Sequence, residues 1–215
     1  MHWVLPSIPA AICLLLLGWA MHGLPWFKIQ GDREAQNVLI LATLAMMGMR
    51  WFNTNAFQGI SLHFLCAGVA TLMFGARFAL WVTALVSLVA WPTNNAWHGP
   101  FFDFLATGAI PIAVVSTIAW GVLRWLPTNL FVYVLCTAFG GGAISIAISN
   151  LFKAAMTTWI FQDVPSWPYL IATPMLMFGE GFFCGGIIVM VVVYRPQWCI
   201  SFDDERYLSP PPPEA

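Results

Sequence analysis

Charged residues are scarce in this chain. Lys, Arg, Asp and Glu make up 8% of its 215 residues, and the formal net charge is −1. A soluble domain usually carries about 25% charged residues, and hydrophobic residues reach 60% here. The sequence has no run of basic residues, which excludes the electrostatic footprint of a nucleic-acid-binding protein. The composition therefore indicates an integral membrane protein, surrounded by the lipid bilayer.

Catalytic signatures and cysteine frameworks are missing as well. The chain has no Walker loop, no HExxH and no GxSxG, so we expect neither an enzyme nor a bound cofactor. Without an ATP-binding motif, any active transport must draw its energy from other chains. The five cysteines are scattered with no CxxC pair, which favours small apolar packing residues over a disulfide framework.

Long apolar segments are what the sequence does contain. A helix needs about 20 mostly apolar residues to cross a bilayer. We predict seven such helices, at residues 4–26, 35–52, 59–78, 79–97, 101–125, 129–156 and 166–194. Six is the alternative count, because the third and fourth segments adjoin with only Arg77 near the join. The predicted fold is an all-α bundle, with residues 1–200 as one polytopic membrane domain and residues 201–215 as an acidic, proline-rich cytoplasmic tail.

The basic residues predict the orientation of this bundle. With seven helices, most Lys and Arg residues fall on one side of the membrane, and Arg50 and Lys153 fall on the other. Basic loops stay in the cytoplasm, so the N-terminus is predicted outside and the C-terminus inside, in a bacterial inner membrane. The 12 tryptophans agree, because each lies near a predicted membrane interface. The first helix lacks a basic n-region and a small-residue cleavage site, so we expect it to be retained.

The chain opens with Met1-His2, and a third residue with nitrogen donors, His63, lies in a charge-free stretch. A free α-amine, the His2 amide nitrogen and the His2 imidazole can close fused chelate rings around one metal ion, and His63 could fill a fourth position. Nitrogen donors in a tetragonal or square-planar set suit Ni²⁺ or Cu²⁺, and imidazole also serves Co²⁺. The alternative for His63 is a side chain that hydrogen-bonds a neighbouring helix.

Three further residues are accessory candidates for the site. His98 lies in an outer loop, where it could capture metal or simply occupy the membrane interface. Asp103 begins the fifth predicted helix, where it could orient a ligating imidazole or serve as an acid favoured at a helix N-terminus. Glu180, flanked by Gly179 and Gly181, is the deepest acid. It is either a neutral hydrogen-bonded carboxyl or a polar point where helices or a partner protein meet.

Several segments together resemble the cobalt/nickel-uptake permease family, the metal-binding membrane subunits of energy-coupling-factor ABC transporters. The family's Met-His start, its His-Leu-Leu-Gly segment, a segment with an asparagine near the site, and its last span have counterparts here. They are Met1-His2, Ser61–Leu65, Phe101–Pro111, and Met177–Gly181 with Tyr194–Trp198. Phe131–Tyr133 and Phe202–Leu208 resemble a proteobacterial branch of the family. The chain departs from the family in having Asp103 in place of the asparagine.

This resemblance implies a seven-helix permease subunit for uptake of Ni²⁺ or Co²⁺. Its N-terminal tail would fold into the bundle, where Met1, His2 and His63 would bind the transported ion. Its partners would be a transmembrane coupling subunit and ABC-type ATPase subunits.

Two other classes of function stay open from the sequence. A non-transporting membrane assembly or structural subunit would use its histidines and Glu180 only to join helices, and it would bind no metal. A binding subunit for a small organic nutrient would use a tryptophan-lined outer pocket. Its binding would depend on Trp91 or Trp97 rather than on His2 and His63.

Overall fold

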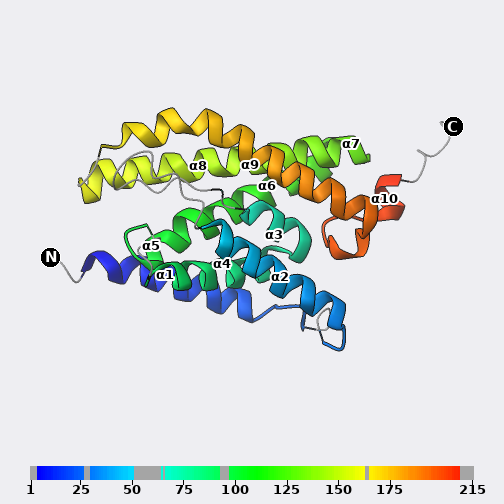
Figure 1. Ribbon diagram of the computed structural model, residues 1–215, viewed down its shortest axis with the longest axis horizontal. Helices are drawn as coiled ribbons and strands as arrows, with labels where there is room; N and C mark the ends of the chain where they lie inside the picture. Colours follow the sequence, from blue (N-terminus) through cyan, green and yellow to red (C-terminus); the bar gives the residue numbers. More distant parts are fainter. Residues whose placement is uncertain are drawn as a thin grey trace.

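The computed structural model describes residues 4–26, 30–50, 64, 66–92, 97–162 and 165–208. Within these residues every regular element is helical (Figure 1). In chain order the elements are α1 (Val4–Met21), α2 (Arg33–Met49), α3 (Ala67–Phe74), α4 (Ala76–Ala90), α5 (Pro100–Phe104), η2 (Leu105–Ala109), α6 (Ile110–Trp125), α7 (Leu130–Val132), η3 (Tyr133–Gly140), α8 (Gly141–Met156), η4 (Thr157–Phe161), α9 (Trp167–Tyr194), η5 (Pro196–Trp198) and α10 (Asp204–Leu208). The all-α prediction is confirmed for this part of the chain.

Within the described residues, three helical runs are long and apolar enough to cross a membrane. They are Pro100–Trp125, Leu130–Phe161 and Trp167–Tyr194, with 26, 32 and 28 residues. Ser7–Met21 and Ala76–Ala90 are also apolar but shorter. The count of seven crossings stays a prediction.

The helices pack side by side, and the beginning of α1 and α10, the first and last described helices, lie at opposite ends of the bundle (Figure 1). The N-terminal end of the bundle carries the beginning of α1, α5, the close of η4 and the beginning of α9. The C-terminal end carries the beginning of α2, the ends of α6 and α9, and α10. Glycines bring α8 and α9 close together, because a Cβ at Gly142 would lie 2.9 Å from the Cβ of Cys184.

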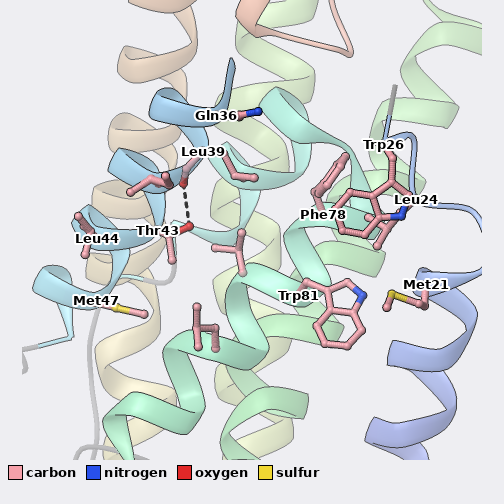
Figure 2. A pocket seen from close by; sticks show the side chains of 13 residues that line it. Met21, Leu24, Trp26, Gln36, Leu39, Thr43, Leu44, Met47, Phe78 and Trp81 are labelled. Carbon is pink, nitrogen blue, oxygen red and sulfur yellow. Dashed lines mark hydrogen bonds between the residues drawn. The ribbon is translucent and has the colours of Figure 1, made fainter. Parts of the chain in front are cut away.

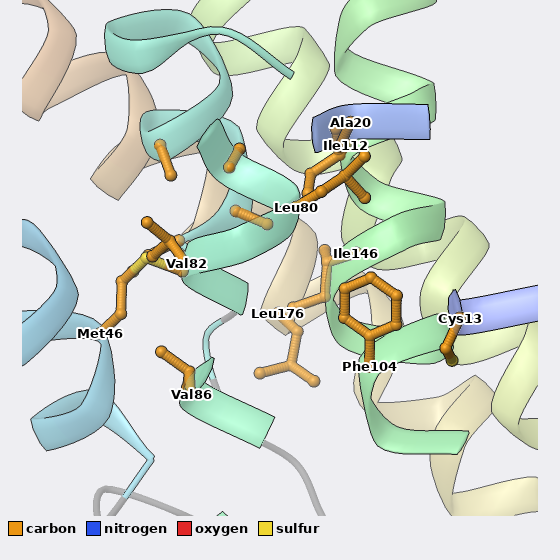
Figure 3. Close-up of a cluster of buried hydrophobic side chains, with 14 of the residues drawn as sticks. Cys13, Ala20, Met46, Leu80, Val82, Val86, Phe104, Ile112, Ile146 and Leu176 are labelled. Atoms are coloured by element: carbon orange, nitrogen blue, oxygen red, sulfur yellow. The ribbon is translucent and has the colours of Figure 1, made fainter. Parts of the chain in front are cut away.

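Buried apolar side chains fill the space between the helices. Figure 3 shows a cluster to which α1, α2, α4, α6, α8 and α9 all contribute. Its members include Cys13, Met46, Leu80, Ile112, Ile146 and Leu176. A second cluster lies toward the C-terminal end around Tyr133, Cys199 and Tyr207. The core therefore runs along the bundle rather than forming one central layer.

The helix described in the third predicted segment is shorter than the one predicted over residues 59–78. The described helix there, α3, has 8 residues and is about 12 Å long at a rise of about 1.5 Å per residue. It is too short to cross a hydrocarbon core about 30 Å thick. It ends at Gly75, whose φ of 85° glycine adopts readily, and α4 begins at the next residue. Residues 59–63 and Leu65 of the predicted helix lie outside the described part.

The segment after α9 returns to cover the end of α3. Carbonyl groups in the last turn of a helix have no partner within that helix. Here the N–H of Ile200 donates to the Met73 carbonyl at 3.0 Å. The N–H of Ser201 donates to the Leu72 carbonyl at 3.2 Å. The beginning of the predicted tail, including the buried Tyr207, therefore packs against the bundle.

Candidate functional site

The predicted metal ligands Met1, His2 and His63 lie outside the described residues, so their role stays a prediction. The accessory candidates are described, and they are His98, Asp103 and Glu180. Among the described residues, no group of three or more His, Cys, Asp and Glu side chains is arranged to hold a metal ion. The accessory residues therefore do not form a metal centre by themselves.

Asp103 lies in the first turn of α5, at the N-terminal end of the bundle. Gly99 precedes this helix with a φ of 97°, and Pro100 takes a first position where no N–H is needed. The side chain of Asp103 is 0% exposed. One carboxylate oxygen is paired with Arg50, and the other accepts a hydrogen bond from the backbone N–H of Trp97 at 3.1 Å. The turn before α5 thus gives a buried acid two donors.

Arg50 connects three parts of the bundle through this contact. It follows α2 directly, and its Nη2 lies 3.1 Å from Oγ1 of Thr107 and 3.4 Å from Oγ of Ser87. Thr107 belongs to η2 and Ser87 to α4. A charge inside a membrane protein is costly unless it is paired. The Arg50 cluster, formed by Arg50, Ser87, Asp103 and Thr107, therefore holds α2, α4 and α5 together.

A second cation, Lys153 of α8, is buried toward the same end. It is 1% exposed, and its Nζ lies 6.0 Å from the centre of the Trp97 ring, within cation–π range. The sequence predicts Arg50 and Lys153 on the outer side of the membrane, and the structure adds that both are buried among the helices. The sequence does contain a pattern that indicates the burial of Lys153. The polar residues Ser149 and Asn150 lie on the same face of the helix at helical spacing, and both are buried.

Aromatic rings surround Trp97, which is 3% exposed. Their centroids lie 5.0–6.5 Å from that of Trp97, and the rings belong to His98, Phe102, Phe152, Phe161 and Tyr169. The His98 ring stacks on Phe161, with centroids 3.6 Å apart. Nε1 of Trp97 is buried and has no hydrogen-bond partner among the described residues. The structure thus brings His98 and Asp103 together at one end of the bundle, with Trp97 between them.

Glu180 lies away from the Arg50 cluster, where α9 meets the beginning of α3. It is located on α9, about 16 Å along the helix axis from Tyr169, and its side chain is 0% exposed. Its Oε1 accepts a hydrogen bond from the backbone N–H of Cys66 at 2.7 Å. Cys66 directly precedes α3, so Glu180 binds the beginning of that buried helix.

Two grooves on the described surface differ in what they offer a ligand. One of about 810 Å³ lies between α1, α2 and α4 (Figure 2). Its polar side chains are Gln36 and Thr43, and the Thr43 hydroxyl donates to the Leu39 carbonyl of its own helix at 2.7 Å. The other, of about 570 Å³, is lined by Trp91, His98 and mostly apolar residues. Only the second groove contains a histidine.

No known protein family, curated protein or solved structure matches the chain. The resemblance to the cobalt/nickel-uptake permeases therefore rests on segments of the sequence. The function has to be argued from the residues and their geometry.

Proposed function

We propose that this chain is the substrate-binding membrane subunit of a transporter that takes up Ni²⁺ or Co²⁺. The Met1 amine, the His2 amide and imidazole nitrogens, and the His63 imidazole bind one ion from the outer side of a bacterial inner membrane. A transmembrane coupling subunit and ABC-type ATPase subunits supply the energy. The donor set suits these ions, because nitrogen ligands favour late transition metals, whereas Mg²⁺ and Ca²⁺ prefer oxygen.

The observation that carries the proposal is the anchoring of the chain directly after His63. Phe64 stacks on Phe183 of α9 with ring centroids 5.5 Å apart, and the amide of Cys66 is bound by Glu180. The residue next to His63 along the chain is therefore held against α9. A specific metal site needs ligands that are held in place.

The helix α1, which follows the N-terminal donors in the sequence, is held in the bundle as well. It begins at Val4, at the N-terminal end of the bundle. Sγ of Cys13 lies 3.6 Å from the carbonyl oxygen of Phe101, so α1 is packed against α5. We propose that the chelate forms at the end of the bundle that also holds Asp103.

The exposed arginines support an outer N-terminus. Those of the described chain flank the C-terminal end of the bundle, and they are Arg33, Arg124, Arg195 and Arg206. Arg50 and Lys153, predicted on the opposite side, are buried and are not surface charges. Exposed basic residues next to membrane helices mark the cytoplasmic side. We therefore assign the C-terminal end to the cytoplasm and the N-terminal end, with His98, to the outside.

The decisive experiment uses the position of the free amine. Purified protein in detergent is compared as the native chain, with one residue added before Met1, and with one residue added after Ala215. The added N-terminal residue moves the amine off the chelate. We therefore expect the N-extended form to lose Ni²⁺ and Co²⁺ binding in titration calorimetry, and the C-extended form to bind like the native chain. Equal binding by the N-extended form would refute the chelate.

The same ligands predict how the affinity depends on pH. A free α-amine has a pKa of about 7.7–8.0 and an imidazole about 6.5, and each must lose its proton before it binds a metal ion. The affinity should therefore fall as the pH decreases from about 8 to about 6. An affinity that stays constant over this range would contradict nitrogen ligation.

One observation favours a second candidate, a binding subunit for a small organic nutrient. The groove of about 570 Å³ beside Trp91 and His98 is in the size range of small-molecule sites, about 300–1,000 Å³. This candidate predicts that none of the three forms of the protein binds Ni²⁺ or Co²⁺. The metal titration therefore separates the two candidates.

A further inference from the structure

The groove between α1, α2 and α4 runs along the helices from the C-terminal end of the bundle (Figure 2). On α2 its lining extends from Gln36 to Met47, about 16 Å along the helix axis. The hydrocarbon core of a bilayer is about 30 Å thick, so one leaflet is about 15 Å deep. The groove therefore has the length of one leaflet, and a helix that crosses the membrane would extend far beyond it.

The walls of the groove are apolar. The Thr43 hydroxyl, halfway along α2, already donates to a carbonyl of its own helix. Near the end at Gln36, the Trp26 and Phe78 rings meet edge to face, with centroids 6.3 Å apart (Figure 2). Tryptophan is enriched where the apolar layer of a membrane meets the headgroups. The groove therefore offers an apolar slot that opens, at its Gln36 end, toward the headgroups.

Two arginines border this open end. Arg33 begins α2 one turn before Gln36, so it lies on the face of α2 that lines the groove. Arg77 lies in the first turn of α4, one turn before Trp81 of the groove lining. The Arg77 side chain also donates to the Gly23 carbonyl, which follows α1. The open end is thus bordered by a cation on α2 and another on α4.

The acids beside Arg33 in the sequence are engaged with other groups. Asp32 accepts from two backbone N–H groups in the first turn of α2, at 2.9 and 3.1 Å. Glu34 accepts from Nε1 of Trp198 at 2.8 Å and lies 3.8 Å from Arg195. Among the described residues, neither arginine of the open end forms an ion pair with an acid. Their charges are therefore available to an anionic group at the membrane surface.

We propose that this groove binds a phospholipid with an anionic headgroup. An acyl chain fills the apolar slot, and Arg33 and Arg77 bind the phosphate at the open end. The planar guanidinium presents several N–H donors that match phosphate oxygens, and basic pockets between membrane helices on the cytoplasmic side bind such headgroups. The site requires neither the metal ligands nor the partner subunits of the proposed function.

The test compares two lipids that differ only in their headgroups. Protein freed of lipid in detergent is titrated with phosphatidylglycerol, which is anionic, and with phosphatidylcholine, which has the same acyl chains and no net charge. Native mass spectrometry counts the lipids bound. The variants are Arg33→Gln and Arg77→Gln. Arg124→Gln is the matched control, because Arg124 is an exposed arginine at the same end of the bundle, on α6 and outside the groove.

We expect the native protein to bind phosphatidylglycerol more tightly than phosphatidylcholine. Each of the two groove variants should lose about fivefold in affinity for phosphatidylglycerol, the effect of one basic side chain near an anionic lipid surface. Their affinity for phosphatidylcholine should change less, and Arg124→Gln should match the native protein. Higher ionic strength should reduce the preference for the anionic lipid, because salt screens exposed charges.

Thr43→Trp tests the apolar part of the site, because an indole at this position would fill the slot. We expect it to weaken the binding of both lipids. Leu151→Trp is the matched control, because Leu151 is 56% exposed on α8 and lines neither groove. Should Thr43→Trp not fold, the exposed Arg33→Gln still decides the outcome.

Equal affinity of the native protein for the two lipids would overturn the inference. Equal losses in Arg33→Gln and Arg124→Gln would also overturn it, because binding would then depend on surface charge in general rather than on the groove. Undiminished binding of phosphatidylglycerol by Thr43→Trp would place the lipid elsewhere. A native dimer that Thr43→Trp converts to a monomer would assign the groove to a second copy of the chain instead of a lipid.

Discussion

Removing one member of the Arg50–Asp103 pair should destabilise the protein more than removing both. The side chain of Asp103 is 0% exposed and that of Arg50 is 5% exposed, so water cannot replace a lost partner. Leucine at position 103 would leave the guanidinium facing the hydroxyl groups of Ser87 and Thr107 without the carboxylate. The lost interaction is therefore that of a buried charge with its counterion.

The size of the effect follows from the burial of the pair. Removing one partner of a buried ion pair costs about 3–5 kcal/mol, and each kcal/mol lowers the Tm of a chain of this size by about 2–4 °C. Asp103→Leu should therefore lower the Tm by about 6–20 °C. The double variant Arg50→Met/Asp103→Leu leaves neither charge, so it should recover much of this loss. The double variant still leaves the N–H of Trp97 without its acceptor, which should cost about 1–3 kcal/mol of stability.

The assay is thermal unfolding in detergent, followed by tryptophan fluorescence, for the native protein, the two single variants and the double variant. Residues in contact usually show interaction energies of about 0.5–3 kcal/mol in such a cycle. The exposed pair Glu34–Arg195, at 3.8 Å, is the control, and its disruption should cost about 1 kcal/mol or less. If the double variant loses as much stability as the two single variants added together, the charges act independently and the reasoning is wrong.

Two further predictions concern packing and orientation. Gly142→Ala should destabilise the protein by about 1–3 kcal/mol, because its Cβ would lie 2.9 Å from that of Cys184. Gly141→Ala should have little effect, because the nearest neighbour of its Cβ would lie at 3.7 Å. Thermal unfolding compares the two variants, and equal Tm values would contradict the close approach of α8 and α9. A reporter protein fused after Ala215 should be active only as a cytoplasmic reporter, because exposed basic residues flank that end, and activity in the periplasm would invert the proposed orientation.

Two of the three long helices of the described chain could be predicted from the sequence almost to the residue. The segment predicted at 101–125 is the run Pro100–Trp125, and the segment predicted at 166–194 is α9, Trp167–Tyr194. The segment predicted at 129–156 begins within one residue of the run Leu130–Phe161, but that run continues past the predicted end. Sustained apolar length is a strong signal, because only a helix satisfies every backbone group in lipid without help from other segments. Proline in the first turn of α5 and of α9 also marks where these helices begin.

The shortened third helix could not be predicted, because its partner is distant in the sequence. The stretch 59–78 is as apolar as its neighbours, so length alone favours a full crossing. Non-helical backbone at membrane depth is tolerated where protein surrounds it, and here Glu180 meets the N–H of Cys66 across 114 positions. No local pattern in the sequence reveals such a contact.

The burial of Arg50 and Lys153 was not predicted, for a related reason. Arg50 and Lys153 each lie near the end of an apolar segment, where a basic residue ordinarily faces the membrane surface. The pairing of Arg50 with Asp103, 53 positions away, depends on how α2 and α5 pack. The sequence did identify Asp103 as a residue to examine, but it did not identify its partner.

The two buried acids of the described chain lead to one consequence for the proposed site. Asp103 is paired with a cation, and Glu180 accepts from the first backbone N–H group of a helix. Both carboxylates are thus engaged with groups of the protein itself. Hard cations such as Mg²⁺ and Ca²⁺ are bound mainly by carboxylate and carbonyl oxygens, whereas Ni²⁺ and Co²⁺ accept imidazole and amine nitrogens. An interior that engages its carboxylates elsewhere and leaves the metal to nitrogen donors would therefore select against the more abundant hard cations.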